Sequence, residues 1–417
     1  MKSEVVIIPN MWNRTANYLF MKKINKNLLF LIVMLGTIFQ GFSQDTKKSK
    51  LSFRDAEDNA FDLSEWIINR NGFVPMPILV TEPAMGGFGI GIAPVFIKQN
   101  KPVESNGKQI PISPDITALF GAYTLNKSWA VGGARTAYIE KYGLRYSIAA
   151  GYGNINMDYY FDLGQFGKDV SFEFDIRTIP VMASLSKQLK DPRFNIGVEY
   201  LFMHNELKVK DKNNYDYAVL EKLSEKIGNY IDDYVSGNVA KLGLKASFDS
   251  RDNTFTPDKG IKAYISADWS NPVVGSDSKY GQFEGAFYNY TPIRYNWING
   301  FRFDMQQVAG NQPFYLKPFI DMRGVPMARY QGKTTMLAEL EERWDFTRRW
   351  SLVGFGGVGK AFDKFSEFGD AEWAWGYGGG FRYLMARKLK LRMGVDFAMG
   401  PEGFAYYLVF GSSWLRQ

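Results

Sequence analysis

The side chains that most often carry acid–base, nucleophilic or metal chemistry are scarce in this chain. It has no cysteine, and its one histidine is His204, within the segment Phe-Met-His-Asn-Glu at 202–206. A lipase-like or protease-like site needs a serine or acidic partner for its histidine. No partner is spaced for His204, and a lone histidine is more typical of a wall or loop position. The sequence therefore predicts no catalytic centre, no metal site and no cofactor.

A charged ladder is the more specific feature. Glu339, Glu341 and Arg343 alternate along a segment that predicts a strand, so they share one face of it. Arg323 and Gly324 lie in the long loop before that strand. Charges inside a membrane protein must be paired or wet, and we expect this loop to fold inward and bring Arg323 to the carboxylates. The alternative is that these are ordinary lumen charges and that Arg323 points to water.

The elements that would hold this ladder follow from a pattern with period two. Leu389 to Phe397 alternates apolar with polar residues, and Ile261 to Trp269 does the same. Successive side chains of a strand point to opposite faces, so each run has one apolar and one polar side. Two-faced strands repeated along a chain are typical of a transmembrane antiparallel β-barrel, with lipid outside and a polar lumen inside.

The composition agrees with this class. Aromatic residues make up 16% of the 417 residues, and there are 41 glycines, as expected from interfacial aromatic girdles and tight turns. The mean hydropathy of −0.24 excludes a bundle of membrane-spanning helices. The net charge of +7 includes five basic residues and one acidic residue within residues 1–43, and the remaining +3 is scattered over strands. Such a small surplus excludes a nucleic-acid footprint.

About sixteen strands are predicted, an even number as bacterial barrels require. Short connections fall on one side and the long loops 211–237, 310–332 and 363–370 on the other, except that residues 99–115 form a long connection on the short-turn side. The predicted strands are 73–81, 87–98, 116–126, 128–139, 143–161, 169–187, 193–210, 238–250, 260–270, 279–293, 295–309, 333–347, 350–362, 371–386, 389–399 and 403–415.

The first 72 residues read as targeting and leader sequence. Lysines at 22, 23 and 26 precede the apolar run 28–39 and small residues near Ser43, which predicts a signal peptide over 1–43 with its true start at Met21. Residues 44–72 form a periplasmic leader, with a short amphipathic helix over Phe61–Asn71. This helix lies at the membrane interface, enters the lumen as a plug, or packs on the barrel rim. The barrel itself is assigned to 73–417.

Several motifs resemble those of the BamA/TamA superfamily of outer-membrane barrels, the bacterial surface antigen domain. The segments Asp249–Asn253 and Thr256–Gly260 resemble its turn D-x-R-D-N…P-x-K-G, through Asp249, Arg251, Asp252, Pro257 and Gly260. Arg323-Gly324 resembles the tip of its sixth loop, and Glu339, Glu341 and Arg343 resemble its N-x-E-x-R strand. Phe410 and Trp414 resemble the aromatic-ended final strand that the barrel-assembly machinery reads.

The chain departs from the family pattern at three points. Val325 replaces the aromatic residue after Arg-Gly, and Gly357 replaces the aspartate of F-x-D-x-G, so that Arg323 loses one acidic partner and keeps Glu341. The sequence also leaves no room for POTRA domains before the predicted barrel, so we expect the resemblance to be to a branch of the family without them.

The resemblance implies insertion or translocation of a protein or lipid at the Gram-negative outer membrane. The partners would be outer-membrane lipids, a client protein or lipid, and the assembly machinery, and no nucleic acid. Edge pairing between the first and last strands would form a seam that opens laterally. A passive diffusion pore or a purely structural barrel stays open as the alternative.

Overall fold

The computed structural model describes residues 52–69, 73–105, 108–110, 112–167, 170–231 and 233–414. These residues belong to one compact unit that begins at Ser52. The predicted signal peptide over 1–43 lies outside the described residues. No helix within the described ranges is long and apolar enough to cross a membrane.

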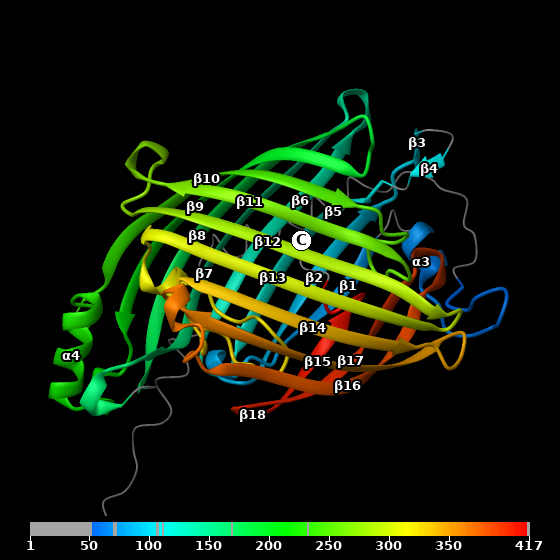
Figure 1. Ribbon diagram of the computed structural model, residues 1–417. Coiled ribbons are helices and arrows are strands. Elements are labelled where there is room, and N and C mark those ends of the chain that lie inside the picture. Colours follow the sequence, from blue (N-terminus) through cyan, green and yellow to red (C-terminus); the bar gives the residue numbers. More distant parts are fainter. Residues whose placement is uncertain are drawn as a thin grey trace, which may run out of the picture. The chain divides into compact units, whose positions relative to one another are not determined.

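Sixteen antiparallel strands form one sheet in which each strand pairs with its neighbour along the chain, so the predicted fold class is confirmed (Figure 1). The strands are β1 (Phe73–Val80), β2 (Gly89–Lys98), β5 (Asp115–Thr124), β6 (Trp129–Ile139), β7 (Leu144–Phe161), β8 (Val170–Gln188), β9 (Phe194–Val209), β10 (Val235–Asp249), β11 (Gly260–Ser270), β12 (Lys279–Arg294), β13 (Trp297–Asn311), β14 (Thr334–Trp344), β15 (Trp350–Phe362), β16 (Trp373–Ala386), β17 (Leu391–Gly400) and β18 (Gly403–Phe410).

The period-two pattern decides which side chains face outward. In β11, Ile265 and Trp269 are 54% and 48% exposed, whereas Ser266 and Asp268 between them are buried on the inner side. A band of exposed apolar side chains around a polar interior is what a membrane-spanning barrel presents to lipid. The alternation read from the sequence therefore sets the register of the wall.

The two ends of the barrel differ. At the end that we call the leader end, the helix α3 (Ser64–Asn69) lies beside the short connection between β16 and β17, where the Lys388 amide donates to the Ser64 hydroxyl at 3.0 Å. At the opposite end, which we call the loop end, the long connections emerge, and α4 (Tyr217–Ile227) lies there (Figure 1).

Two elements were not predicted from the sequence. The connection 99–115 contains a small hairpin of β3 (Val103–Ser105) and β4 (Lys108–Ile110), and the loop 211–237 contains α4. Leu220 and Leu223 of α4 are buried in an apolar cluster with side chains of β7, β8 and β9, such as Phe172 and Phe174. This tertiary packing stabilises a helix of eleven residues that would be marginal alone.

The predicted helix over Phe61–Asn71 is shorter in the structure, where α3 begins at Ser64. Ile67 is 1% exposed and packs in a cluster with Val95 and Ile97 of β2, and Leu63 and Trp66 pack against the same cluster. Ile90 and Ile92 of β2 lie on the opposite, outward face, so the helix packs on inward-facing side chains at the leader end. These contacts place α3 on the inner face of the wall, which excludes the predicted alternative in which it lies at the membrane interface.

The wall has one discontinuity. β1 and β18 are the two ends of the strand order, and among the described residues no ladder of hydrogen bonds joins them. The fifteen other neighbouring pairs are joined by ladders, a few of which contain a local bulge or a gap of two residues. We call the line between β1 and β18 the seam.

The last strand is shorter than predicted. β18 ends at Phe410, five residues before the predicted end at 415, because Gly411 adopts a φ of 72° and turns the chain out of the sheet. The amide of Gly411 still donates to the Arg392 carbonyl at 2.7 Å, and the amide of Ser412 donates to the Phe255 carbonyl at 2.7 Å. Trp414 is therefore not part of the final strand, which corrects the prediction made from its sequence.

Candidate functional site

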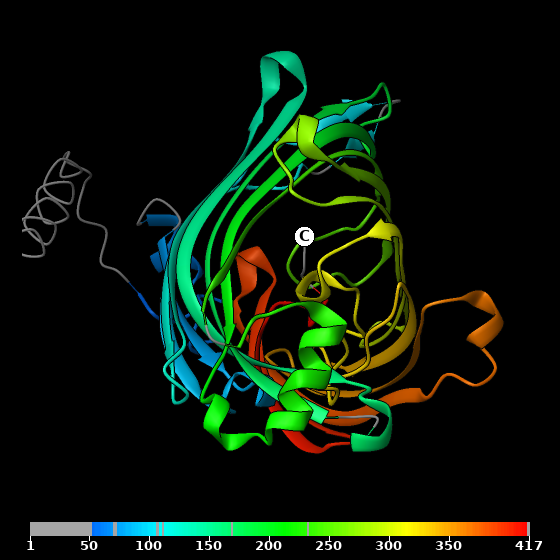
Figure 2. The ribbon, with the colours of Figure 1, turned by 90° about the vertical axis from the view of Figure 1, so that its left-hand side faces the viewer.

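The loop between β13 and β14 folds back into the barrel as a hairpin. Phe319 and Gln331 form an antiparallel bridge, and the Ile320 amide donates to the Tyr330 carbonyl at 3.0 Å. Viewed from the loop end, this segment runs inside the ring of strands (Figure 2). Its apolar side chains form a buried cluster against two wall residues: Ile320, Met322, Val325 and Tyr330 pack on Leu337 and Ala374. Val325, which replaces the usual aromatic residue, is thus part of a packed core.

The tip of the hairpin requires glycine. Gly324 has a φ of 88°, a left-handed conformation that other residues adopt at a cost. A Cβ atom at this position would lie 2.9 Å from the Met399 carbonyl oxygen. The Gly324 amide donates to the Tyr407 hydroxyl of β18 at 2.9 Å. The loop tip is therefore attached directly to the last strand, on one side of the seam.

Arg323 is the centre of a buried ion-pair network. Its Nη1 lies 2.8 Å from Glu341 Oε2 and 2.8 Å from Asp396 Oδ2, and its guanidinium carbon lies 3.6 Å from the centre of the Phe355 ring. The Arg323 side chain is 9% exposed. Of the residues expected at this site, the structure thus brings Arg323, Gly324, Glu339 and Glu341 together. We call the Arg323 contacts the loop lock.

Glu339 has a second cation. Its Oε2 accepts from Arg302 Nη1 of β13 at 2.6 Å, and Arg323 Nε lies 3.7 Å from its Oε1. Arg302 also donates to Asp304 through Nε at 2.8 Å. Because Glu339 is 2% exposed and has two guanidinium neighbours, its charge is compensated by protein cations.

Asp396 of β17 was not predicted, although it supplies the acidic partner that the sequence suggested was missing. It is fully buried and pairs with Arg323 and, through two hydrogen bonds of 2.6 and 2.9 Å, with Arg382. The family pattern places an aspartate at 357, where this chain has glycine. A Cβ atom at Gly357 would lie 2.5 Å from Glu339 Cγ and 2.5 Å from Met322 Sδ. In this chain the second carboxylate that pairs with Arg323 therefore comes from β17 and not from β15.

Arg343 does not join the loop lock. It points to the leader end, where its Nη1 donates to the Pro257 carbonyl at 3.1 Å and its Nη2 pairs with Asp258. Its Nε lies 3.2 Å from Asp345. Although burial opposes the shift, the charges of Arg343 and Lys390 lower the pKa of Asp258. The strand motif thus has two roles: its glutamates hold the loop, and its arginine holds the turn 250–259.

The turn motif is held together by its own side chains. Arg251 donates to both carboxylate oxygens of Asp249, at 2.9 and 2.7 Å. Asp252 Oδ1 accepts from the amides of Asp258 and Lys259. Gly260 has a φ of 109°, and a Cβ atom there would lie 2.4 Å from the Ser250 carbonyl oxygen. The pattern in the sequence therefore describes a rigid connection between β10 and β11.

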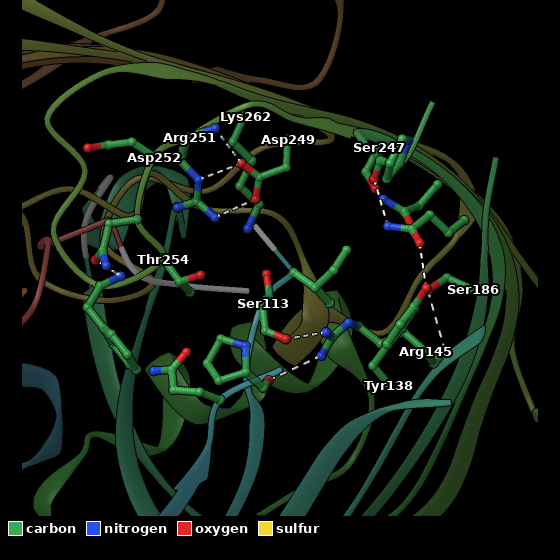
Figure 3. Close-up of a pocket in the computed structure, with 18 residues that line it drawn as sticks. Ser113, Tyr138, Arg145, Ser186, Ser247, Asp249, Arg251, Asp252, Thr254 and Lys262 are labelled. Carbon is green, nitrogen blue, oxygen red and sulfur yellow. Dashed lines mark hydrogen bonds and ion pairs between the residues drawn. The ribbon is translucent and has the colours of Figure 1, made fainter. Parts of the chain in front are cut away.

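Beside this turn lies a polar cavity of about 240 Å³, enclosed by the inner wall and the segment 112–114. Figure 3 shows Arg145 and Arg251 on its walls. Arg145 Nη2 donates to the Ser113 carbonyl, and Arg251 is bound to Asp249. Both arginines are therefore engaged within the protein, and Lys262 is a third cation that lines the cavity. His204 lies elsewhere, in β9, with its Nδ1 2.8 Å from Asn238 Oδ1.

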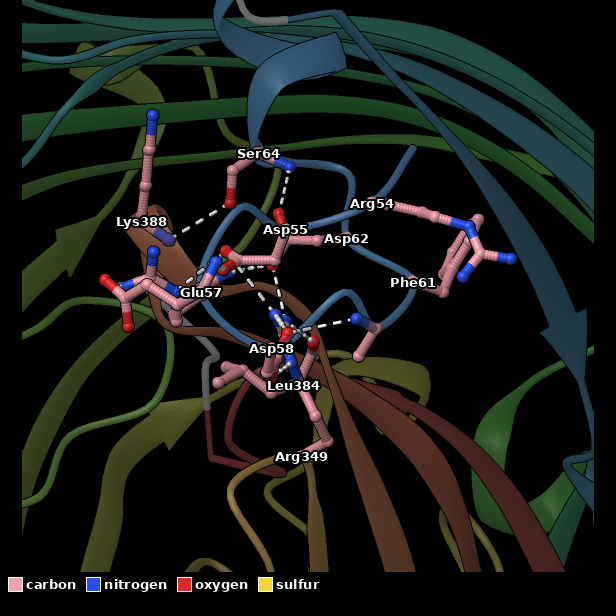
Figure 4. Close-up of polar contacts among 12 residues, drawn as sticks. Arg54, Asp55, Glu57, Asp58, Phe61, Asp62, Ser64, Arg349, Leu384 and Lys388 are labelled. Carbon is pink, nitrogen blue, oxygen red and sulfur yellow. Dashed lines mark hydrogen bonds and ion pairs between the residues drawn. The ribbon is translucent and has the colours of Figure 1, made fainter. Parts of the chain in front are cut away.

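The leader is attached at the opposite end from the loop by a second charged cluster (Figure 4). Arg349 Nη2 and Nε bind Asp58, at 2.8 and 2.6 Å, and Nη1 binds Asp62. Arg387 binds Asp55 at 2.8 Å. Hydrogen bonds from Arg349 hold the pKa of Asp58 at about 2, and a hydrogen bond from Arg387 lowers the pKa of Asp55. We call this cluster the leader clamp.

The comparisons with known proteins agree with this geometry. A family profile described as "Omp85 superfamily domain" matches residues 132–399. Among solved structures, BamA from Haemophilus ducreyi lacking POTRA domains 1–3 is 15% identical, with a TM-score of 0.54 over 81% of this chain and 69% of that one. A search of curated proteins found no match.

Two further barrels have the same fold. CdiB from Acinetobacter baumannii is 9% identical with a TM-score of 0.50, and CdiB from Escherichia coli is 8% identical with a TM-score of 0.55. Each match covers 81% of this chain, and this chain spans 58% and 62% of their lengths. At these identities the likeness establishes the fold. The described residues that precede β1 here, 52–69, contain α3 and no POTRA-like domain.

Proposed function

Because this chain belongs to the Omp85 superfamily, we propose that it assists the insertion or translocation of a protein or lipid at the outer membrane of a Gram-negative bacterium. In this proposal the barrel is not an enzyme and carries no cofactor. The barrel acts by opening and closing a lateral path between two strands of its wall. The partners are outer-membrane lipids and the client, and the assembly machinery acts on the barrel itself.

The seam is the observation that supports this proposal best. A strand edge without a partner presents backbone N–H and C=O groups in a row, and such an edge binds another strand readily. β1 and β18 are such edges here, whereas every other strand in the wall is paired on both sides. Separating any other two neighbouring strands would break the hydrogen bonds of their ladder, so opening the wall at the seam costs the least free energy.

The contents of the lumen disfavour passive diffusion. The leader packs into one mouth, the loop between β13 and β14 crosses the interior, and the chain after β18 turns inward. A cavity of about 270 Å³ lies between the loop and the inner face of β18. A diffusion pore needs a continuous wet channel. These three segments occupy part of the lumen through which solute would have to pass.

A disulfide across the seam tests the proposal. The chain has no cysteine, so a pair of cysteines placed in β1 and β18 forms the one possible bridge. The matched control is a bridge across a complete ladder, Ala267→Cys with Phe283→Cys, which face each other in β11 and β12. Both variants are tested in cells that lack the native gene, by the exclusion of large antibiotics, and as purified barrels in planar bilayers.

We expect the variant with the seam bridge to lose function when the disulfide is oxidised and to regain it when the disulfide is reduced. The variant with the control bridge should function in both states. Both proteins should keep the heat-dependent gel shift of a folded barrel. A passive pore predicts that the bridged seam supports outer-membrane integrity as well as the parent does, with steady conductance. That result would replace the translocation proposal with a pore.

A further inference from the structure

The chain after β18 occupies a built site inside the barrel. Gly411 turns it inward, and Trp414 is 4% exposed, with its ring centre 6.0 and 6.4 Å from those of Tyr290 and Tyr288 on β12. Ser412 Oγ lies 3.1 Å from the Tyr290 hydroxyl. The site is lined by buried residues of three strands: Tyr264, Tyr288, Tyr290 and Ile298. We call residues 411–414 the tail.

The wall is shaped for the indole ring. Gly300 of β13 faces Trp414, and a Cβ atom at this position would lie 2.9 Å from Trp414 Cζ3 and 3.2 Å from Cη2. These distances are shorter than a packed carbon contact allows. The absence of a side chain at residue 300 therefore makes room for Trp414, which explains this glycine in the middle of a strand.

The tail also contacts the carboxylates of the loop lock. Trp414 Nε1 donates to Glu339 Oε2 at 3.1 Å, and the Ser413 hydroxyl donates to Glu341 Oε2 at 2.7 Å. These are the two glutamates that face Arg323 from β14. A buried carboxylate that loses a donor becomes less well held in position, since its remaining partners no longer fix both oxygens.

We propose that this lumen wall is a docking site for the chain's own tail, and that the docked tail holds the loop lock closed. The tail and the loop bind the same two carboxylates, and Tyr407 of β18 binds the loop tip just three residues before the strand ends. Release of the tail would therefore loosen Glu339, which Trp414 binds, and Glu341, which Ser413 binds, and with them the attachment of Arg323. The end of the last strand and the loop then form one coupled unit.

The test measures the accessibility of the loop core in the purified barrel. A single cysteine at Val325, which is 4% exposed, reports opening by its rate of reaction with a thiol reagent. Two variants remove the docked tail from opposite sides: Trp414→Ala truncates the indole, and Gly300→Ala fills the space that it needs. Matched controls are Trp344→Ala on the outward face and Gly354→Ala, where a Cβ atom would meet nothing within 4 Å.

We expect Trp414→Ala and Gly300→Ala each to speed the labelling of the cysteine at 325 by more than about tenfold, since the lost hydrogen bond to a charged group contributes about tenfold and the lost packing of the ring adds to it. The controls should label at the parent rate. Trp414→Phe keeps an aromatic ring and loses the donor to Glu339, so its rate should lie between the parent and Trp414→Ala. Trp414→Phe also replaces Trp414→Ala as the test variant if Trp414→Ala does not fold.

The proposal would be overturned if folded Trp414→Ala and Gly300→Ala barrels label at the parent rate. The tail would then fill space in the lumen without affecting the loop. Equal acceleration by the controls would overturn it as well, because it would show general loosening of the wall. The measurement needs no transport assay. Its failure would leave the proposed function unaffected, and a failed seam test would leave the docking site unaffected.

Discussion

Replacing Asp396 by asparagine is expected to be the most damaging single change in the loop lock. Asp396 is fully buried and binds two guanidinium groups, Arg323 at 2.8 Å and Arg382 at 2.6 and 2.9 Å. Asparagine keeps the shape and removes the charge, which leaves two buried cations short of a partner. Breaking a buried ion pair lowers the free energy of unfolding by about 3–5 kcal/mol. Because Asp396 takes part in two such pairs, we expect a loss of about 5 kcal/mol for this variant.

Substitutions at the other residues of the loop lock should lower the free energy of unfolding by less, because each leaves the remaining charged partners better compensated. Arg323→Ala leaves Asp396 with Arg382, Glu339 with Arg302 and Glu341 with the Ser413 hydroxyl, so about 3 kcal/mol is expected. Glu341→Gln leaves Arg323 with Asp396, and about 2 kcal/mol is expected from the loss of one charged hydrogen bond.

Urea unfolding of the purified barrel in lipid vesicles, followed by tryptophan fluorescence and by gel mobility, measures these free energies. The control is Lys222→Ala in α4, whose pair with Glu225 is as short, at 2.6 Å, but has both side chains more than half exposed. It should change the free energy of unfolding by less than about 1 kcal/mol. The double variant Arg323→Ala with Glu341→Ala should cost less than the sum of its single changes, with a coupling energy of about 0.5–3 kcal/mol.

Two outcomes would refute this reasoning. If Asp396→Asn is no more damaging than Lys222→Ala, then Asp396 is not the acidic partner that replaces the family's aspartate. If the losses at Arg323 and Glu341 are additive, then the two side chains do not meet in the folded barrel and the loop is not held from within.

Three further predictions concern other parts of the chain. Gly357→Asp, which restores the family residue, should destabilise this barrel by at least about 1–3 kcal/mol in the same urea assay, because Glu339 and Met322 leave no space for its side chain; equal stability would contradict that steric argument. The leader clamp should weaken only in acid: the pKa of Asp58 is lowered from 3.8 to about 2, so its contribution is complete above about pH 4 and is lost as the pH falls towards 2. Proteolysis of the leader should accordingly be slow at pH 6 and, with an acid-active protease, fast near pH 2, and Arg349→Ala should make it fast at both; cleavage independent of Arg349 would exclude the clamp. The mature N-terminus should be found near Gln44 by mass spectrometry of outer-membrane fractions, and a chain that retains residues 21–39 would contradict a cleaved signal.

The fold could be predicted from strand periodicity because the face that a wall residue occupies depends on its position in its own strand. Each residue faces lipid or lumen by its place in its own strand, so the alternation around Ile265 or Leu340 is visible without any neighbour. The sequence missed α4, whose apolar side chains gain their stability from β7–β9, and the β3–β4 hairpin within the connection 99–115. It also extended the last strand to 415, because Trp414 resembles the aromatic end of the family's final strand until the turn at Gly411 is known.

The sequence by itself determined the barrel class and a count of about sixteen strands, since alternation within each strand sets its two faces. It also identified Arg323, Gly324, Glu339 and Glu341 as candidates, while leaving open whether Arg323 turns inward or points to water. Only the tertiary structure decided that Asp396 completes the lock, that Arg343 serves the turn instead, and that Trp414 docks on the far wall. Asp396 is 73 residues from Arg323 along the chain, and Trp414 is 75 from Glu339. Closure of the barrel brings such residues together across the lumen, and no local pattern in the chain records which strands will face each other there.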